Sequence, residues 1–294
     1  MILKIFTKLI TVLIPLLFIQ SLLFSPLTKA EDILIFIRDD VYQDYMTFLN
    51  GRDVHTIKNF SGKNIRRDVV DMIIAQQALK IGGFEHSFKY ATGKINFRNT
   101  KMLASGRLLI SFDSYWLADA KALNDSVYTS DAVIRQGEYI AGIYTSPSNN
   151  AVLAITELDD LQKFTAVSTP KWRTDWQTLK LLSLKELIHE DEWLSQARMV
   201  NLGWIDFLLM PFNSTPDQSF TMDKIHLVPV KGVAIELKDS RHFVISTKHP
   251  HGKTAFKAIN IGLKKLRSQH RIVQAFTQAG FFVSPDKVKI LNLN

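Results

Sequence analysis

The sequence contains no cysteine. Disulfide bonds, thiolate metal sites and a lipid anchor on a cysteine are therefore excluded. The eight histidines form no HExxH motif, and His249 and His251, which flank Pro250, are typical of a solvated turn. We expect no cofactor and no metal, so the fold must be stabilised by burial of apolar side chains.

The chain also lacks a cluster of basic residues and a long apolar run beyond its N-terminal region. Its 36 Lys and Arg are interspersed with 28 acids, giving a formal charge of +8. A mixed-charge surface of this kind does not indicate nucleic-acid binding. Without a later apolar run of about 20 residues, no transmembrane helix is expected after the N-terminal region.

The first 30 residues have the pattern of a cleavable signal peptide. Two lysines precede an uncharged apolar stretch from Leu9 to Leu23, and the small-residue step Thr28-Lys29-Ala30 stands just before Glu31. A basic start, an apolar stretch and small residues at −3 and −1 favour cleavage after Ala30. An uncleaved membrane anchor is the alternative, but Pro15 and Gln20 interrupt the apolar stretch. We therefore expect a mature periplasmic protein of +5 charge, since the peptide removes three lysines and no acid.

The N-terminal half of the mature chain alternates strand and helix patterns. A continuous apolar run at Ile33–Ile37 suits a strand buried on both faces. Apolar residues at helical spacing predict a helix over 69–81, and strands are predicted at 84–90 and 108–112, with a short helix over 97–105 between them. This β-α-β-α-β order predicts a parallel sheet.

A second α/β set follows the strand predicted at Tyr139–Tyr144. Thr169-Pro170 indicates a helix start, with Thr169 as the cap. The helix that begins there is expected to end at about 182. Further strands are expected at 164–167, 204–210, 225–230, 233–237 and 241–247, and further helices over 190–200, 255–266 and 272–279.

Taken in this order, four motifs resemble those of the type II periplasmic solute-binding proteins, typified by the polar-amino-acid binding proteins of ABC transporters. An apolar first strand follows a signal peptide. Gly106–Asp113 and Gly203-Trp204-Ile205-Asp206 resemble the family's glycine-to-acid entry into a strand. Tyr128-Thr129-Ser130, which precedes 139–144, resembles its aromatic-Ser/Thr turn. Phe243–Pro250 resembles its return strand, and the helix end Leu263-Lys264-Lys265-Leu266 with Gly280 resembles its closing helices.

The resemblance implies an α/β fold of two lobes joined by two hinge strands, with a ligand between the lobes. Lobe 1 is expected to contain residues 31–144 and 246–294, and lobe 2 residues 145–245. A monomer and an inner-membrane transporter or sensor partner are the expectations for this family. Ligands of open α/β sheets lie beyond the carboxyl ends of the strands, which agrees with a site between the lobes.

Two anchors of the amino-acid binding members are missing. The arginine expected before the aromatic-Ser/Thr turn is absent from Ala118–Leu123, where Lys121 lacks a bidentate fork. Pro211 stands where the family has an aspartate that holds the amino group. A free α-amino acid is therefore not the expected ligand.

Aromatic and polar residues near the strand ends are the remaining candidates for ligand contact, since aromatic rings stack on rings or cations and a basic helix start can hold an anion. Any of them could instead be structural: Trp172 lies four residues from Trp176 and could belong to a helix face, and Trp116 could pack beneath the site. The predicted ligand-binding residues are Asp39, Tyr42, Phe112, Ser114, Tyr115, Trp116, Lys121, Thr169, Trp172, Arg173, Phe212 and Asn213.

Three functions are compatible with this sequence. The first is a solute-binding protein that delivers a small molecule to a transporter or reports it to a membrane sensor. The second is a degenerate member that acts in signalling through protein contacts alone. The third is an enzyme on this fold, for which Asp40 and Asp113 are the only acids at strand ends and no GxSxG motif or partner histidine is present. We expect no catalytic residues.

Overall fold

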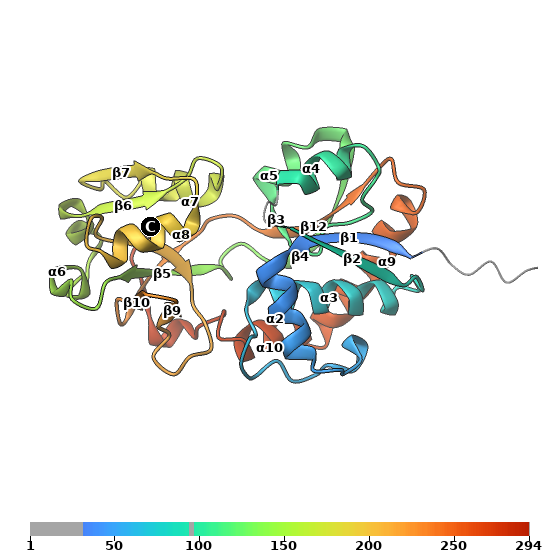
Figure 1. Cartoon of the computed structure of the whole chain (residues 1–294), viewed down its shortest axis with the longest axis horizontal. Coiled ribbons are helices and arrows are strands. Elements are labelled where there is room, and N and C mark those ends of the chain that lie inside the picture. Colours follow the sequence, from blue (N-terminus) through green and yellow to red (C-terminus); the bar gives the residue numbers. More distant parts are fainter. Residues whose placement is uncertain (1–31, 94–96, 294) are drawn as a thin grey trace, which may run out of the picture. The chain divides into compact units, whose positions relative to one another are not determined.

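The computed structural model describes residues 32–93 and 97–293. The predicted signal peptide lies outside these residues. Residues 33–294 form one compact unit, and the described residues contain no helix that is both long and apolar enough to span a membrane. The unit is a mixed α/β structure in which the strands fall into two groups, each with its own helices (Figure 1).

The first group begins with the parallel pair β1 and β2, as the apolar run at 33–37 predicts. Residues 127–134 and 241–246 form an antiparallel pair, β4 and β12, which β3 extends. The elements of this group are β1 (Ile33–Arg38), α2 (Asp39–Leu49), a 3-10 turn (Val54–Thr56), α3 (Arg67–Ile81), β2 (Phe88–Gly93), α4 (Phe97–Ala104), β3 (Tyr115–Trp116), α5 (Leu117–Lys121), a 3-10 turn (Asn124–Ser126), β4 (Val127–Ile134), β12 (Arg241–Ser246), α9 (Gly252–Ser268) and α10 (Arg271–Gln278).

The strand predicted at 108–112 is reduced to a single bridge. Ile110 pairs with Ile245, and the pairing is antiparallel rather than parallel. The strand stops because the Ser111 hydroxyl donates to the Asp113 carbonyl and accepts from the Asp113 backbone N–H, at 2.7 and 3.2 Å. Such a local turn offers the backbone an alternative to the sheet ladder. The predicted β-α-β-α-β parallel sheet is therefore confirmed only for β1 and β2.

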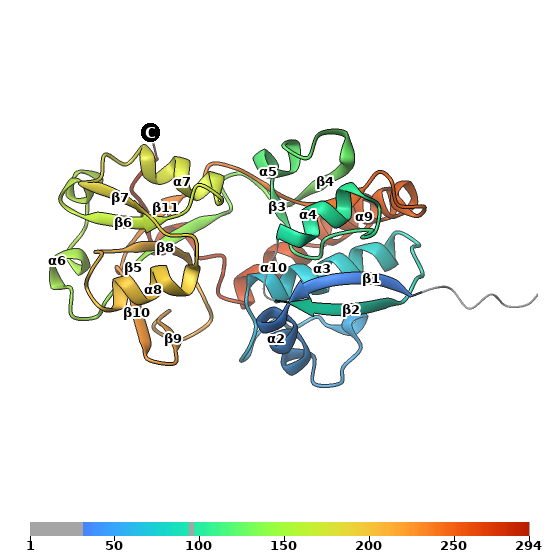
Figure 2. The ribbon, with the colours of Figure 1, turned by 45° about the horizontal axis from the view of Figure 1, so that its top comes forward.

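Helices α3 and α9 pack at backbone contact, side by side in both views of the ribbon (Figures 1 and 2). Every residue of α3 from Val69 to Leu79 is buried. A Cβ added at Gly82 would lie 2.0 Å from the Ala258 carbonyl oxygen, and one added at Gly262 would lie 2.0 Å from that of Ala78. Only glycine permits this approach, so the two positions determine the spacing of the helices.

The second group is organised around β5. Strand β8 takes one edge of β5, while β10 and β11 share the other edge. The elements of this group are β5 (Ile140–Thr145), α6 (Asn150–Leu153), a 3-10 segment (Leu158–Lys163), β6 (Thr165–Ser168), α7 (Arg173–Lys180), β7 (Glu186–His189), α8 (Trp193–Asn201), β8 (Leu208–Pro211), β9 (Phe220–Met222), β10 (Ile225–Pro229) and β11 (Val233–Glu236).

Helix α7 begins later than predicted. Its first residue is Arg173 and its N-cap is Trp172, so Thr169-Pro170 is not the helix start. The Thr169 hydroxyl donates to the Asp191 carboxylate at 2.6 Å, and the Trp172 N–H donates to the Thr169 carbonyl. Thr169 therefore holds the loop between β6 and α7 instead of capping the helix.

Within residues 32–93 and 97–293 the chain passes between the two groups of strands three times. Strand β5 follows β4, and β12 follows β11, which gives the two expected connections. After α10 the C-terminal segment returns, through a 3-10 turn (Pro285–Lys287), to the second group, where β13 (Lys289–Ile290) pairs in parallel with β11. The lobe limits predicted from the sequence remain a prediction. The strand pairings lead us to propose that 140–236 and 289–291 form one lobe and that 32–134 and 241–280 form the other.

Candidate functional site

Buried and half-buried polar residues between α3, the turn after Ile110 and β12 form what we call the charge cluster: Arg67, Asp68, Asp71, Asp113, Ser114 and Arg241. Arg67 is its centre. Its guanidinium lies 2.6 Å from Asp71 Oδ2 and 3.1 Å from Asp113 Oδ1, and it also contacts Asp68. One arginine thus binds three carboxylates.

Arg241, the first residue of β12, closes the cluster from the other side. Its Nε donates to the Ser114 hydroxyl at 3.0 Å, and its Nη2 lies 3.6 Å from Asp113 Oδ1. The Ser114 hydroxyl in turn donates to Asp71 Oδ2 at 2.6 Å. The guanidinium of Arg241 stacks 4.8 Å from the ring of Trp116, whose ring is also 4.8 Å from that of Tyr139.

The charges of the cluster are compensated within the protein. Two arginines face three aspartates, so the cluster offers no surplus positive charge to a ligand anion. Burial alone would raise the pKa of Asp68, but Arg67, Arg66, Arg38 and Arg241 hold it well below its usual range. For Asp71 burial prevails, and its pKa is raised to about 6 although Arg67 and Arg241 lower it.

Asp71 predicts a specific dependence of stability on pH. The ordinary pKa of an aspartate, 3.8, is raised to about 6 for Asp71 in the fold. A carboxyl whose pKa is higher in the folded state stabilises the fold when protonated, and this contribution is lost as the pH rises from about 4 to about 6. The Asp71→Asn variant carries an amide that does not ionise, so it does not lose this stability as the pH rises. Relative to the parent chain, its free energy of unfolding should therefore increase by roughly 2 kcal/mol between pH 4 and pH 7.

Urea unfolding at both pH values measures this difference. Asp159→Asn, at an exposed carboxylate, is the control and should change little between them. A constant difference between Asp71→Asn and the parent chain would contradict the raised pKa of Asp71.

Contacts between α5, α7 and the segment before β12 join the two groups of strands beside the cluster. Arg173 Nε lies 3.2 Å from Asp119 Oδ1. Asp239 Oδ2 accepts from the Thr174 hydroxyl at 3.3 Å and from the Ala118 backbone N–H at 3.2 Å. The first turn of α7 is therefore tied both to α5 and to a connecting segment.

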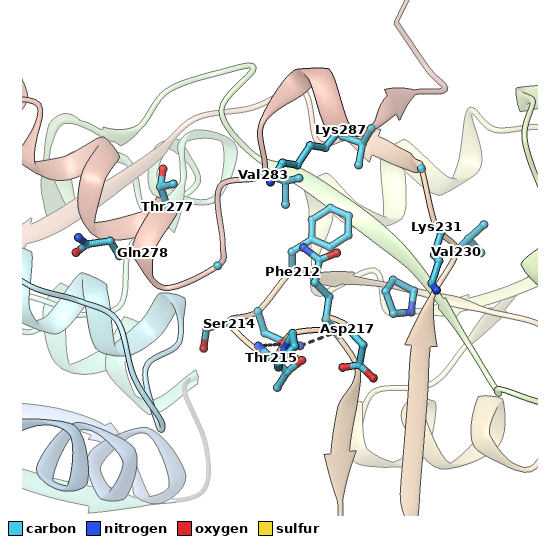
Figure 3. A pocket seen from close by; sticks show the side chains of 17 residues that line it. Phe212, Ser214, Thr215, Asp217, Val230, Lys231, Thr277, Gln278, Val283 and Lys287 are labelled. Carbon is cyan, nitrogen blue, oxygen red and sulfur yellow. Dashed lines mark hydrogen bonds between the residues drawn. The ribbon is translucent and has the colours of Figure 1, made fainter.

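A separate pocket of about 650 Å³ lies between the β8–β9 loop, the β10–β11 turn and the end of α10 with the segment that follows it (Figure 3). Phe212 and Asn213 line it, and none of the six cluster residues does. A Cβ at Gly280 would lie 2.2 Å from the Asn213 carbonyl oxygen, so the loop and the helix end are in backbone contact. The Asn213 side chain bonds to Gln218, Ser219 and Thr215 and thereby holds its own loop.

The structure brings three of the predicted site residues to the charge cluster or its edge. Ser114 belongs to it, Trp116 lies against Arg241, and Arg173 reaches the Asp119 carboxylate beside it. Tyr115 is half-buried next to them, and burial raises the pKa of its hydroxyl to about 12. Whether these side chains contact a ligand stays a prediction.

The other predicted residues lie elsewhere. Phe112 is buried in the core, and the centre of its ring lies 5.1 Å from the centre of the Phe88 ring. The ring of Tyr42 packs on the rings of Tyr45 and Tyr90. The remaining residues are at the following places: Asp39 exposed in the first turn of α2, Lys121 exposed at the end of α5, Thr169 bonded to Asp191, Trp172 partly exposed before α7, and Phe212 buried with Asn213 at the pocket.

The cluster residues that the sequence did not predict are Arg67, Asp68, Asp71 and Arg241. One signal was available, since Arg67 and Asp71 are four residues apart and so lie on one face of a helix. Asp113 was identified only as an acid at a strand end. Arg241 begins a strand, and nothing in the sequence pairs it with residues more than 100 positions earlier.

The three aspartates of the cluster are close enough for a metal ion, with one oxygen each within 4.8 Å of the others. Arg67 already donates to Asp71 and Asp113 and contacts Asp68. A guanidinium therefore occupies the position that a cation would need, and the cluster does not fit a metal ion.

Comparison with solved structures identifies the fold. The ligand-binding core of GluR0 in complex with L-glutamate matches at a TM-score of 0.56 and 9% identity, over 85% of this chain and 99% of that one. The probable amino-acid ABC transporter extracellular-binding protein YtmK from Bacillus subtilis matches at 0.54 and 11%, over 86% and 100%. The periplasmic VFT2 domain of BvgS from Bordetella pertussis matches at 0.54 and 13%, over 71% and 83%.

These matches share one architecture, the two-lobed type II periplasmic-binding-protein fold, and this chain has that fold. The fold predicted from the sequence is thereby confirmed. No protein-family model matches the chain, and no curated protein does. At identities of 9–13% the chain is a divergent representative of the fold.

Proposed function

We propose that this chain is an extracytoplasmic solute-binding protein that captures a small molecule between its lobes. The observation that supports this most directly is the position of the charge cluster, which gathers polar groups beside the contacts joining α5 and α7. In open α/β folds ligands bind beyond the carboxyl ends of the strands, and Asp113 and Ser114 follow Ile110, which bridges to Ile245 of β12.

The ligand we propose is not a free α-amino acid. The family's arginine and aspartate anchors are absent, and the arginines that the fold does place here, Arg67 and Arg241, are bound by Asp71 and Asp113. A ligand carboxylate would have to displace an internal carboxylate. A ligand that hydrogen-bonds to Asp113 and packs on nearby aromatic rings needs no such exchange.

The predicted signal peptide and the fold support a proposal about the protein's setting. We propose that it is exported to the periplasm, acts as a monomer, and presents its ligand to an inner-membrane transporter or sensor. YtmK is named as a probable extracellular-binding protein of an ABC transporter, which supports a transporter partner, and BvgS VFT2 is named as a periplasmic domain, which supports the periplasmic setting. We propose binding without catalysis.

A second candidate function is signalling through protein contacts alone. The internal compensation of Arg67 and Arg241 favours it, because a cleft whose charges already satisfy one another needs no ligand to close. In that case the contacts of Asp119 and Asp239 with α7 would hold the lobes together permanently.

Thermal melts of residues 31–294 against amines, amino acids, sugars, organic acids and aromatic compounds test the proposal. A ligand at one hundred times its dissociation constant stabilises by about 2.7 kcal/mol. For a chain of this size we expect a rise in melting temperature of roughly 5–10 °C for one chemical class.

Thermal melts of the Asp113→Asn variant against the same compounds are the matched experiment. Loss of the shift in this variant would assign the ligand to the charge cluster. No shift for any class in the parent chain would contradict solute binding and favour the protein-contact function.

A further inference from the structure

Three histidines from two distant segments of the sequence lie together in the first group of elements. The ring of His86, just before β2, is 4.5 Å from the ring of His251, which is 5.6 Å from the ring of His249. We call these residues the histidine cluster. All three residues are half-buried.

The loop that carries His249 and His251 is held rigidly. Gly252 begins α9, and a Cβ there would lie 2.1 Å from the Ser246 carbonyl oxygen, so the loop is in backbone contact with the end of β12. The Gly252 N–H donates to the His249 carbonyl at 2.8 Å, and the Ala255 N–H donates to that of His251 at 2.9 Å. The two imidazoles therefore start from fixed backbone positions.

The ring of His86 is oriented by its neighbours. It lies 4.6 Å from the ring of Phe84, which also meets His251 edge-on at 6.2 Å. The Nδ1 atom of His86 is buried and has no hydrogen-bond partner among the described residues. A buried ring nitrogen without a partner is costly to the fold unless another group satisfies it.

We propose that His86, His249 and His251 form a binding site for a divalent transition-metal ion of the Zn²⁺, Ni²⁺ and Cu²⁺ class. Imidazole nitrogen is a preferred ligand of these ions, whereas Mg²⁺ and Ca²⁺ prefer oxygen. Metal binding needs neutral imidazole. Burial and the neighbouring His251 lower the pKa of both His86 and His249, a direction that favours the neutral ring.

Binding requires a small rearrangement. The three rings do not bring one nitrogen each within 4.8 Å, a spacing that among the described residues only the three cluster aspartates reach. His249 Nδ1 accepts a long hydrogen bond of 3.2 Å from the His251 backbone N–H. The proposed site therefore requires that His249 rotate about its side-chain bonds and give up this weak bond.

The site is independent of the proposed function. Strands β1 and β2 are parallel, His86 precedes β2, and Asp39 follows β1. The histidine cluster is therefore at the end of this strand pair opposite to Asp39. Solute binding between the lobes and metal binding here can be tested separately.

The test is calorimetric titration of residues 31–294, without a histidine tag, with NiCl₂ and ZnCl₂. We expect saturable binding of one ion per chain. His86→Gln, His249→Gln and His251→Gln should each weaken it by about tenfold or more. His226→Gln, at an exposed histidine elsewhere in the fold, is the matched control and should leave the affinity unchanged.

Electron paramagnetic resonance with Cu²⁺ gives a second measurement, because imidazole nitrogens split the copper signal. We expect nitrogen splitting in the parent chain and in His226→Gln, and its reduction in each cluster variant. Absence of saturable binding below about 1 mM metal ion, or an affinity that His86→Gln or His249→Gln leaves unchanged, would overturn the three-histidine site.

Discussion

Replacing Arg67 by methionine is expected to lower the free energy of unfolding by about 3–5 kcal/mol, the usual cost of removing one partner from a buried ion pair. The Arg67 side chain is 13% exposed, and that of Asp71 is fully buried. Methionine fills a similar volume but leaves Asp68, Asp71 and Asp113 without their shared guanidinium. Their mutual repulsion then opposes folding as long as they are ionised.

Urea unfolding at pH 7 and at pH 4 measures this effect. The loss should shrink at pH 4, because carboxyls deprived of Arg67 take up protons more readily and protonation removes the repulsion. Arg135→Met, at an exposed arginine, is the matched control and should cost less than about 0.5 kcal/mol. A loss below about 1 kcal/mol for Arg67→Met would show that the charge cluster contributes little to stability.

Gly262→Val is expected to destabilise the fold by about 3 kcal/mol or more. Any Cβ at this position would lie 2.0 Å from the Ala78 carbonyl oxygen, and a backbone atom of a buried helix cannot move aside as a side-chain end can. Overpacking of this kind costs about 1–3 kcal/mol and sometimes more. The better intrinsic helix propensity of valine, worth only a few tenths of a kcal/mol over glycine, does not offset this cost.

Lys257→Val introduces the same residue at an exposed position of the same helix, and denaturant unfolding compares the two variants. The control should lose no more than about 0.7 kcal/mol, the range of helix propensities among ordinary residues. Equal losses for the two variants would mean that α9 can move away from α3 without cost.

The sequence predicts most elements because their patterns are local. The apolar run of β1 and the helical periodicity of α3 and α9 match the structure closely. The errors occur where a side chain competes with the backbone. Ser111 ends a predicted strand through its own turn, and Thr169 bonds to Asp191 rather than capping α7. Neither partner is visible in a sequence pattern, since it depends on where the folded chain places an oxygen atom.

The candidate site could be predicted only in part, since it is made by contacts between distant residues. Ser114 and Trp116 were found because polar and aromatic residues follow an expected strand. Arg241 meets Ser114 across 127 positions, a pairing that only the fold creates. His86 and His251 are likewise brought together by the fold, which is why the sequence suggested no histidine site.

The parallel pairing of β13 with β11 has a consequence for how the protein is made. Synthesis runs from the N-terminus, so β11 leaves the ribosome with one edge unpaired and keeps it until residues 289–291 follow. An open strand edge is a template for association with another chain. Lys289 also pairs with Glu157, and Asn292 exchanges hydrogen bonds with the Glu236 backbone. Residues 289–292 thus cover an edge of the second sheet, and we expect a chain truncated before Lys289 to be prone to aggregate.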